Sequence, residues 1–168
     1  RKLAEKMVNI GKSFNRNIAA VITNMDRPLG CAIGNSLEVL EAVSVLKGNE
    51  VPDFDRVCVA LASTLLSLCY DISHEESEKR VLESIKSGTA LAKFREWITA
   101  QGGSDEFVDN PEALGTAKYI TEYKAQGSGY ISFMNTEMIG KAAAALGAGR
   151  EKTTDSVDHT AGIVLRKK

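Results

Sequence analysis

Hydrophobic residues recur at intervals of three and four positions along most of this chain. The pattern opens with Leu3, Met7, Ile10 and Phe14. On a helix of about 3.6 residues per turn, this spacing places the apolar side chains on a single face. The first segment is therefore predicted to be a helix with one apolar stripe.

The same periodicity continues after residue 34 and predicts further helices. Two of them begin at capping pairs, Asn35 with Glu38 and Ser73 with Glu76, in which a glutamate follows the N-cap residue by three positions. Glycines close helices because they accept the left-handed conformation, and Gly88 closes the second of these. Helices are thus expected over residues 35–48 and 73–85.

Two other helices are predicted from composition and spacing. Pro52 suits the first turn of a helix, and the interior from Val57 to Cys69 is apolar on nearly every face, which predicts a buried helix. The second of these helices has an apolar stripe of Leu91, Phe94 and Ile98 and ends at the glycines of positions 102 and 103.

A strand is expected before the helix that starts at Asn35. Residues 18–23 are apolar and β-branched, and Pro28, Gly30 and Gly34 then break the strand. A strand that runs through a Pro/Gly loop into a capped helix is the place where α/β enzymes hold charged or polar ligands.

The chain changes character after the polar segment 105–115, which contains Pro111. Residues 118–124 and 129–134 are predicted to be strands joined by a hairpin turn. A short helix over residues 136–146 and a strand over 161–165 follow. The organisation predicted is an α/β segment of one strand and several helices over residues 1–115, then α+β structure over residues 116–168.

Composition excludes some classes of function. The net charge of -1 and the absence of a clustered basic face argue against nucleic acid or an anionic membrane as partner. The basic run of residues 166–168 is interpreted as a solvated end. No stretch reaches the roughly 18 apolar residues of a membrane span. Three cysteines without CxxC spacing indicate reduced thiols and a cytoplasmic location.

Other candidate sites are interpreted as structural. Gly11, Lys12 and Ser13 resemble the end of a phosphate-binding loop, but the first glycine of that motif is missing. His74 lies among glutamates in a first helical turn, where solvent exposure is expected. Asp155, Asp158 and His159 offer metal-ligand chemistry, but the neighbouring Ser and Thr residues favour turns and caps.

The stretch from Asn24 to Ala42 reads NMDRPLGCAIGNSLEVLEA. It resembles the segment D/N-M-x-x-P-L-G-x-A-[IV]-G-N-[AS]-L-E-V-x-E-A of pyrimidine-nucleoside phosphorylases and thymidine phosphorylases. The resemblance continues, in order, at residues 100–103, 117–119, 129–130, 146–150 and 162–165. Several motifs at consistent spacing make this a specific signal.

The resemblance implies an activity for the parent protein. Such enzymes use phosphate as co-substrate to convert pyrimidine nucleosides (thymidine, uridine, deoxyuridine) to free base and ribose or deoxyribose 1-phosphate, and they are homodimers. Their phosphate loop and base-contacting residues lie upstream of the matched part. No catalytic or substrate-binding residue is therefore assigned here, the α+β C-terminal domain is expected to be incomplete, and the chain alone is expected to be inactive.

Alternatives remain open at this point. The chain could be a non-catalytic interaction or regulatory module on the same scaffold, or it could come from a thymidine-only or a nucleotide phosphorylase. The dimer interface of the family lies largely upstream, so no oligomeric state is predicted for this chain.

The Pro/Gly loop also carries a candidate cation site. Loop carbonyls and one carboxylate are the oxygen ligands that hard cations prefer, and Glu41 lies on the helix that the loop opens. The resemblance implies a structural potassium ion held by the carbonyls of Leu29 and Ala32 and by Glu41. The alternative is that Glu41 is a surface residue and the loop only a turn.

Overall fold

The computed structural model describes residues 1–150 and 152–167. Lys168, the last residue of the basic run, lies outside this part. In chain order the elements are α1 (Lys2–Ser13), β1 (Ala32–Ile33), α2 (Asn35–Leu46), α3 (Pro52–Tyr70), α4 (His74–Lys86), α5 (Thr89–Ala100), the 3-10 turns η1 (Glu106–Val108) and η2 (Pro111–Leu114), α6 (Thr136–Ala143), the π-helical turn η3 (Ala144–Ala148) and β2 (Ile163–Val164).

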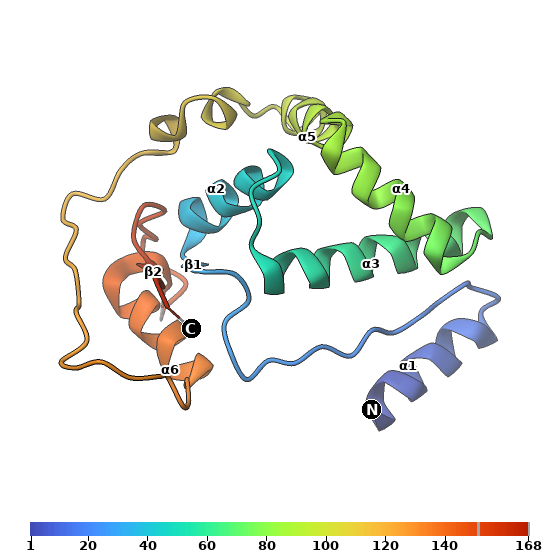
Figure 1. The fold of residues 1–168 in the computed structure, drawn as a ribbon, viewed down its shortest axis with the longest axis horizontal. Coiled ribbons are helices and arrows are strands. Elements are labelled where there is room, and N and C mark those ends of the chain that lie inside the picture. Colours follow the sequence, from blue (N-terminus) through green and yellow to red (C-terminus); the bar gives the residue numbers. More distant parts are fainter. Residues whose placement is uncertain (151, 168) are drawn as a thin grey trace.

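The chain forms an open arc around α2 (Figure 1). Helices α3, α4 and α5 follow one another along one side, an extended segment runs down the other, and α6 lies near β1 and the start of α2. Helices dominate and the described strands form a single small sheet. This confirms the predicted fold class, a helical α/β segment followed by an incomplete α+β part.

The hydrophobic core lies where α2, α5 and η1 meet. Val43, Phe107 and Val108 are buried, and Val108 has no exposed surface. The partly buried side chains packed against them come from α2, α5 and η2: Leu40, Leu91, Phe94, Ile98 and Leu114. The stripe predicted on α5 is therefore confirmed as a core face. Two of these three buried residues, Phe107 and Val108, come from the polar segment 105–115.

Helices α3 and α4 form a second packed pair, with Ser63 and Ser77 fully buried. Both starts were predicted: Pro52 occupies the first turn of α3, and the Ser73 hydroxyl accepts the Glu76 N–H at 3.1 Å. The prediction that α3 is buried is wrong, since Leu65 is 63% exposed. Among the described elements, only α4 packs extensively on α3, and Leu61, Leu65 and Tyr70 remain exposed.

The described sheet consists of β1 and β2, which pair antiparallel with Ala32 opposite Val164 and Ile33 opposite Ile163. Strand β2 lies inside the predicted strand 161–165. Strand β1, in contrast, lies within the loop between Pro28 and Gly34, where no strand was predicted. Its extended backbone is held by β2, which comes from the other end of the chain.

Three predicted strands are wrong. Residues 18–23, 118–124 and 129–134 are extended, but none of them pairs with another described segment, and their side chains are largely exposed. Tyr123, for example, is 93% exposed. A β-strand is stabilised by hydrogen bonds to a neighbouring strand, and no described segment offers these residues an edge.

The predicted helices at the two ends are confirmed. Helix α1 forms as predicted, but its apolar stripe faces solvent, and Phe14 is 72% exposed. Helix α6 begins at Asn135, whose side chain accepts the Met138 N–H at 3.0 Å, and η3 prolongs it as far as Gly147 with φ 110°.

Among residues 1–150 and 152–167, no single helix has both the length and the apolar character of a membrane span. Helices α3 and α4 meet that test only when they are taken together, and the pair is bent by 119° at the break between them.

Candidate functional site

The Pro/Gly loop folds back onto the helix that it opens. Pro28 and Gly30 are buried, and Gly30 has φ +69°. The Glu41 carboxylate faces the loop: its Oε1 accepts the Cys31 N–H at 2.8 Å. A Cβ at position 30 would lie 2.1 Å from Oε2 of Glu41. A glycine at position 30 therefore makes room for the carboxylate against the loop backbone.

The start of α2 differs by one residue from the prediction. Gly34 is the N-cap, and its N–H donates to Oε1 of Glu38 at 3.0 Å. Glu38 thus bonds the N-cap N–H as a capping glutamate does, but that residue is Gly34, and the N-cap role predicted for Asn35 is wrong. The Asn35 side chain instead donates to the carbonyl of Ala148 at 3.3 Å. This bond to a distant part of the chain takes the place of a local cap.

The C-terminal segment 158–165 completes the site. The His159 carbonyl accepts the Ser36 N–H at 3.0 Å, in the first turn of α2. The Leu165 N–H donates to the Cys31 carbonyl at 2.8 Å. Cys31 is therefore hydrogen-bonded on one side to Glu41 and on the other to the C-terminal segment.

The register of the sheet orients the carbonyl of Ala32. Because Cys31 and Leu165 form a hydrogen-bonded pair, the next pair, Ala32 with Val164, exchanges no ladder bonds. The Ala32 carbonyl thus points away from β2, while its side chain is buried. Its oxygen is one of the two carbonyls assigned to a cation by the resemblance.

The three predicted cation ligands lie on one short stretch of structure. Leu29 is in the loop with its side chain partly exposed, Ala32 is in β1, and Glu41 reaches back from α2 to the loop between them. Two backbone carbonyls and one carboxylate form an all-oxygen donor set, which fits a hard cation such as potassium. Within the described residues, no group of three or more His, Cys, Asp or Glu side chains is placed to hold a metal ion.

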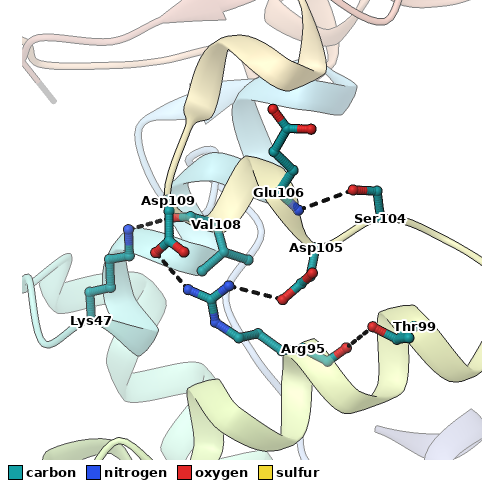
Figure 2. A network of polar contacts seen from close by, with 8 residues as sticks. All are labelled: Lys47, Arg95, Thr99, Ser104, Asp105, Glu106, Val108 and Asp109. Carbon is teal, nitrogen blue, oxygen red and sulfur yellow. Dashed lines mark hydrogen bonds and ion pairs between the residues drawn. The ribbon is translucent and has the colours of Figure 1, made fainter.

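A separate polar network holds η1 against α2 and α5 (Figure 2). Arg95 donates to Asp105 at 2.9 Å and to Asp109 at 2.6 Å. Hydrogen bonding to Asp105, then to Asp109, raises the pKa of the Arg95 guanidinium. The ammonium of Lys47 donates to the carbonyl of Val108. Sequence reasoning missed this network, because its partners come from three different elements.

The other titratable candidates lie on the surface or in turns. His74 and His159 are exposed. Asp158 accepts the Thr160 hydroxyl at 2.7 Å and the Thr160 N–H at 2.8 Å. These bonds, the hydroxyl first, lower the pKa of Asp158. Asp155 accepts the Lys152 N–H at 2.9 Å. Both aspartates therefore stabilise turns.

The three cysteines are free thiols. Burial, and secondarily the nearby charge of Asp55, raise the pKa of Cys58. A raised pKa leaves less thiolate at neutral pH, so Cys58 is a poor nucleophile.

Comparisons with known proteins identify relatives along the whole chain. A family model described as the pyrimidine nucleoside phosphorylase C-terminal domain matches residues 130–168. The pyrimidine-nucleoside phosphorylase of Staphylococcus epidermidis strain ATCC 12228 is 44% identical over 167 residues, 99% of this chain and 39% of the relative.

Two further relatives agree. The pyrimidine-nucleoside phosphorylase of Geobacillus stearothermophilus is 43% identical over 169 residues, 100% of this chain and 39% of the relative. That of Staphylococcus aureus strain USA300 is 43% identical over 167 residues, 99% of this chain and 39% of the relative. The chain thus spans about two fifths of the length of the curated relatives that it matches.

Proposed function

This chain belongs to the pyrimidine-nucleoside phosphorylase family, and from that premise we propose that the protein carrying it exchanges the base of a pyrimidine nucleoside for phosphate. In this reaction the bond between the sugar C1′ and the base nitrogen breaks. A bond from C1′ to a phosphate oxygen forms, and the base leaves with a proton. The substrates proposed are thymidine, uridine and deoxyuridine, and the sugar product is ribose or deoxyribose 1-phosphate.

The observation that carries the proposal is the extent of the similarity. An identity of 43–44% runs over 99–100% of the chain and is not confined to one motif. A segment this similar throughout is expected to keep the family's packing, and with it the framework on which a phosphorylase positions its substrates. Nucleoside phosphorylases are transferases, so the reaction class follows from the same observation.

The chain is proposed to act as a scaffold and to be inactive alone. It spans 39% of its relatives. The described residues bring together no cluster of nucleophile, base and anion-binding groups comparable to an active site. In this proposal, the groups that hold phosphate and pyrimidine belong to the remainder of the family's length.

Potassium is proposed as a structural ion at the Leu29 and Ala32 carbonyls and the Glu41 carboxylate. The support from the structure is the orientation of Glu41, which turns toward the loop, and of the Ala32 carbonyl, which points away from β2. A bound cation would supply positive charge that neutralises Glu41 and orders the loop.

The remaining parts of the proposal concern assembly and location. The complete protein is proposed to be a cytoplasmic homodimer with no nucleic-acid or membrane partner. The net charge of -1 supports the absence of a nucleic-acid or membrane partner, since polyanion binding needs a basic face.

Release of free base tests the proposed function. We would compare the protein expressed from its complete reading frame with the 168-residue chain, by following thymine release from thymidine and uracil from uridine and deoxyuridine in the presence of phosphate. The complete protein is expected to release base only when phosphate is present, and the chain alone is expected to release none.

Each other outcome has a definite meaning. Release from thymidine alone would make the enzyme thymidine-specific, and release only from nucleoside monophosphates would make it a nucleotide phosphorylase. Activity of the 168-residue chain would overturn the scaffold role. Inactivity of the complete protein on all of these substrates would contradict the proposed function and favour a non-catalytic module.

A further inference from the structure

We infer that docking of the C-terminal segment 158–165 and cation binding at the loop 28–34 are thermodynamically coupled, each strengthening the other. The inference rests on the cation site proposed above and adds its regulation. The two regions are far apart in sequence but lie side by side around β1 and the start of α2 (Figure 1). Three sets of contacts connect them.

The first connection passes through a single residue. The N–H of Cys31 donates to Oε1 of Glu41 at 2.8 Å, and the carbonyl of Cys31 accepts the Leu165 N–H at 2.8 Å. Glu41 is the charged ligand of the proposed site. Undocking of Leu165 would release the carbonyl of Cys31, the residue whose N–H holds the Glu41 carboxylate toward the loop.

The second connection stabilises the helix that carries Glu41. The first N–H groups of a helix have no partner within the helix, and the N-cap of α2, Gly34, has no side chain to provide one. The His159 carbonyl accepts the Ser36 N–H at 3.0 Å and takes this role. Undocking the segment would leave the Ser36 N–H without this acceptor and would destabilise the start of the helix that carries Glu41.

The third connection is a close contact between two backbones. A Cβ at Gly162 would lie 2.2 Å from the carbonyl oxygen of Ile33 and 2.8 Å from Cδ1 of Leu37. A Cβ at Gly34 would lie 2.4 Å from the carbonyl oxygen of Ala161. All three separations are shorter than real Cβ contacts, so the segment docks in this way only because positions 34 and 162 are glycines.

These contacts predict the sign of the coupling. A loop rich in Gly and Pro loses conformational freedom when it arranges carbonyls around an ion, and this loss weakens binding. Docking of the segment orders the same residues beforehand, so the cation binds more tightly to the docked state. Linkage is reciprocal, and the cation must therefore favour docking by the same factor.

The substitution Gly162→Ala tests the coupling. Gly162 does not have a positive φ, so the added methyl group acts through the contact with Ile33 and Leu37 rather than through backbone strain. Gly127→Ala is the matched control, because a Cβ there meets nothing within 4 Å. Affinity for thallium(I), a potassium substitute visible by NMR, would be measured on the protein from its complete reading frame.

Gly162→Ala is expected to weaken thallium binding by about tenfold, within the range typical of coupled sites, and Gly127→Ala to leave it unchanged. Equal affinity in all three proteins would overturn the coupling and leave the cation site standing. Absence of binding to the unsubstituted protein would overturn the cation site and the coupling together. Phosphorolysis, assayed on the same samples, shows separately whether the proposed reaction stands.

A second measurement needs no substitution and covers the case in which Gly162→Ala fails to fold. Amide exchange at Leu165 and Ser36 would be followed in potassium and in choline, which is too large to bind carbonyl oxygens in this loop. Both amides are expected to exchange about tenfold more slowly in potassium. The amide of Val108, bonded to the Asp105 carbonyl in the core, serves as reference. Equal slowing of all three amides, or of none, would contradict the coupling.

Discussion

The core around α2, α5 and η1 differs sharply from the extended segment 117–134, although both are rich in large apolar residues. Phe107 and Val108 are buried in the core, whereas Phe133 in the extended segment is 77% exposed and Tyr123 is nearly fully exposed. Hydrophobic character alone therefore does not bury a residue. Burial needs a second surface of matching shape within reach of the chain.

The two regions differ in how they obtain that surface. Helices α2 and α5 form most of their backbone hydrogen bonds internally and pack mainly through side-chain contacts, which η1 supplies shortly after the end of α5. An extended segment has no internal hydrogen bonds and needs another strand at its edge. The described part of the chain provides such an edge for β1, through β2, and for no part of 117–134.

The largest effect is expected from Phe107→Ala. Phe107 packs edge-on against Phe94, with ring centroids 6.2 Å apart, and contacts the centre of the core. Removing it should lower the free energy of unfolding by about 3–4 kcal/mol, from lost burial and the cavity left behind. Urea unfolding followed by far-UV circular dichroism measures this change.

Phe133→Ala is the matched control for that substitution. Because Phe133 is 77% exposed, the same change of side chain should alter the free energy of unfolding by no more than about 0.5 kcal/mol. Equal losses at positions 107 and 133 would show that segment 117–134 is packed in solution, and the contrast between the two regions would be lost.

An intermediate effect is expected from Ser73→Ala, which tests a helix outside the core. The Ser73 hydroxyl accepts the Glu76 N–H at the start of α4, whereas the bond from Ser77 uses the Ser73 backbone carbonyl and is retained. Loss of the cap should cost about 1 kcal/mol. Ser87→Ala, at the other end of α4, is the control and should cost clearly less in the same urea titration.

A smaller effect is expected from Arg95→Gln. Arg95 connects α5 to η1 through Asp105 and Asp109, but Asp109 is largely exposed and the pairs are accessible to solvent. The melting temperature should fall at low salt, and the difference from the unsubstituted protein should shrink at about 0.5 M NaCl, where charges are screened within a few ångströms. A difference that does not depend on salt would show that packing of the Arg95 side chain is what matters.

The smallest effect is expected from acidification at Asp158. Its pKa is lowered from the ordinary value of 3.8, chiefly by the Thr160 hydroxyl. The resulting stabilisation is fully present above the unfolded pKa near 3.8 and is lost as the pH falls through the lower folded value. An NMR titration of the Thr160 amide should report a midpoint below 3.8, and Asp158→Asn should abolish that transition. A midpoint at or above 3.8 would contradict the turn.

Local signals predicted most of the helical structure. Ser73 as the N-cap of α4, Pro52 at the start of α3 and the stripe of α5 were interpreted correctly, because each acts over about one helical turn or one face. The other half of that capping box is replaced, since the Glu76 carboxylate accepts from Arg80. Asn35 was misassigned for the opposite reason. The groups that satisfy the start of α2 include the His159 carbonyl, which is remote in sequence and invisible to a local pattern.

In the candidate site, too, some features could be predicted from the sequence and others depend on contacts between distant segments. The resemblance grouped Leu29, Ala32 and Glu41, and the chemistry of their oxygens is evident from the residues themselves. That Glu41 turns back toward the loop, and that segment 158–165 holds Cys31 from the other side, appears only in the folded chain.

The sequence by itself determined where helices form and which motifs relate this chain to a phosphorylase family, since both depend on residues close together along the chain. The tertiary structure alone decided which extended segments become strands, which apolar faces are buried, and which distant carbonyl completes α2. The physical reason is that pairing and burial require a partner surface, and which surfaces meet is set by the packing of the whole molecule.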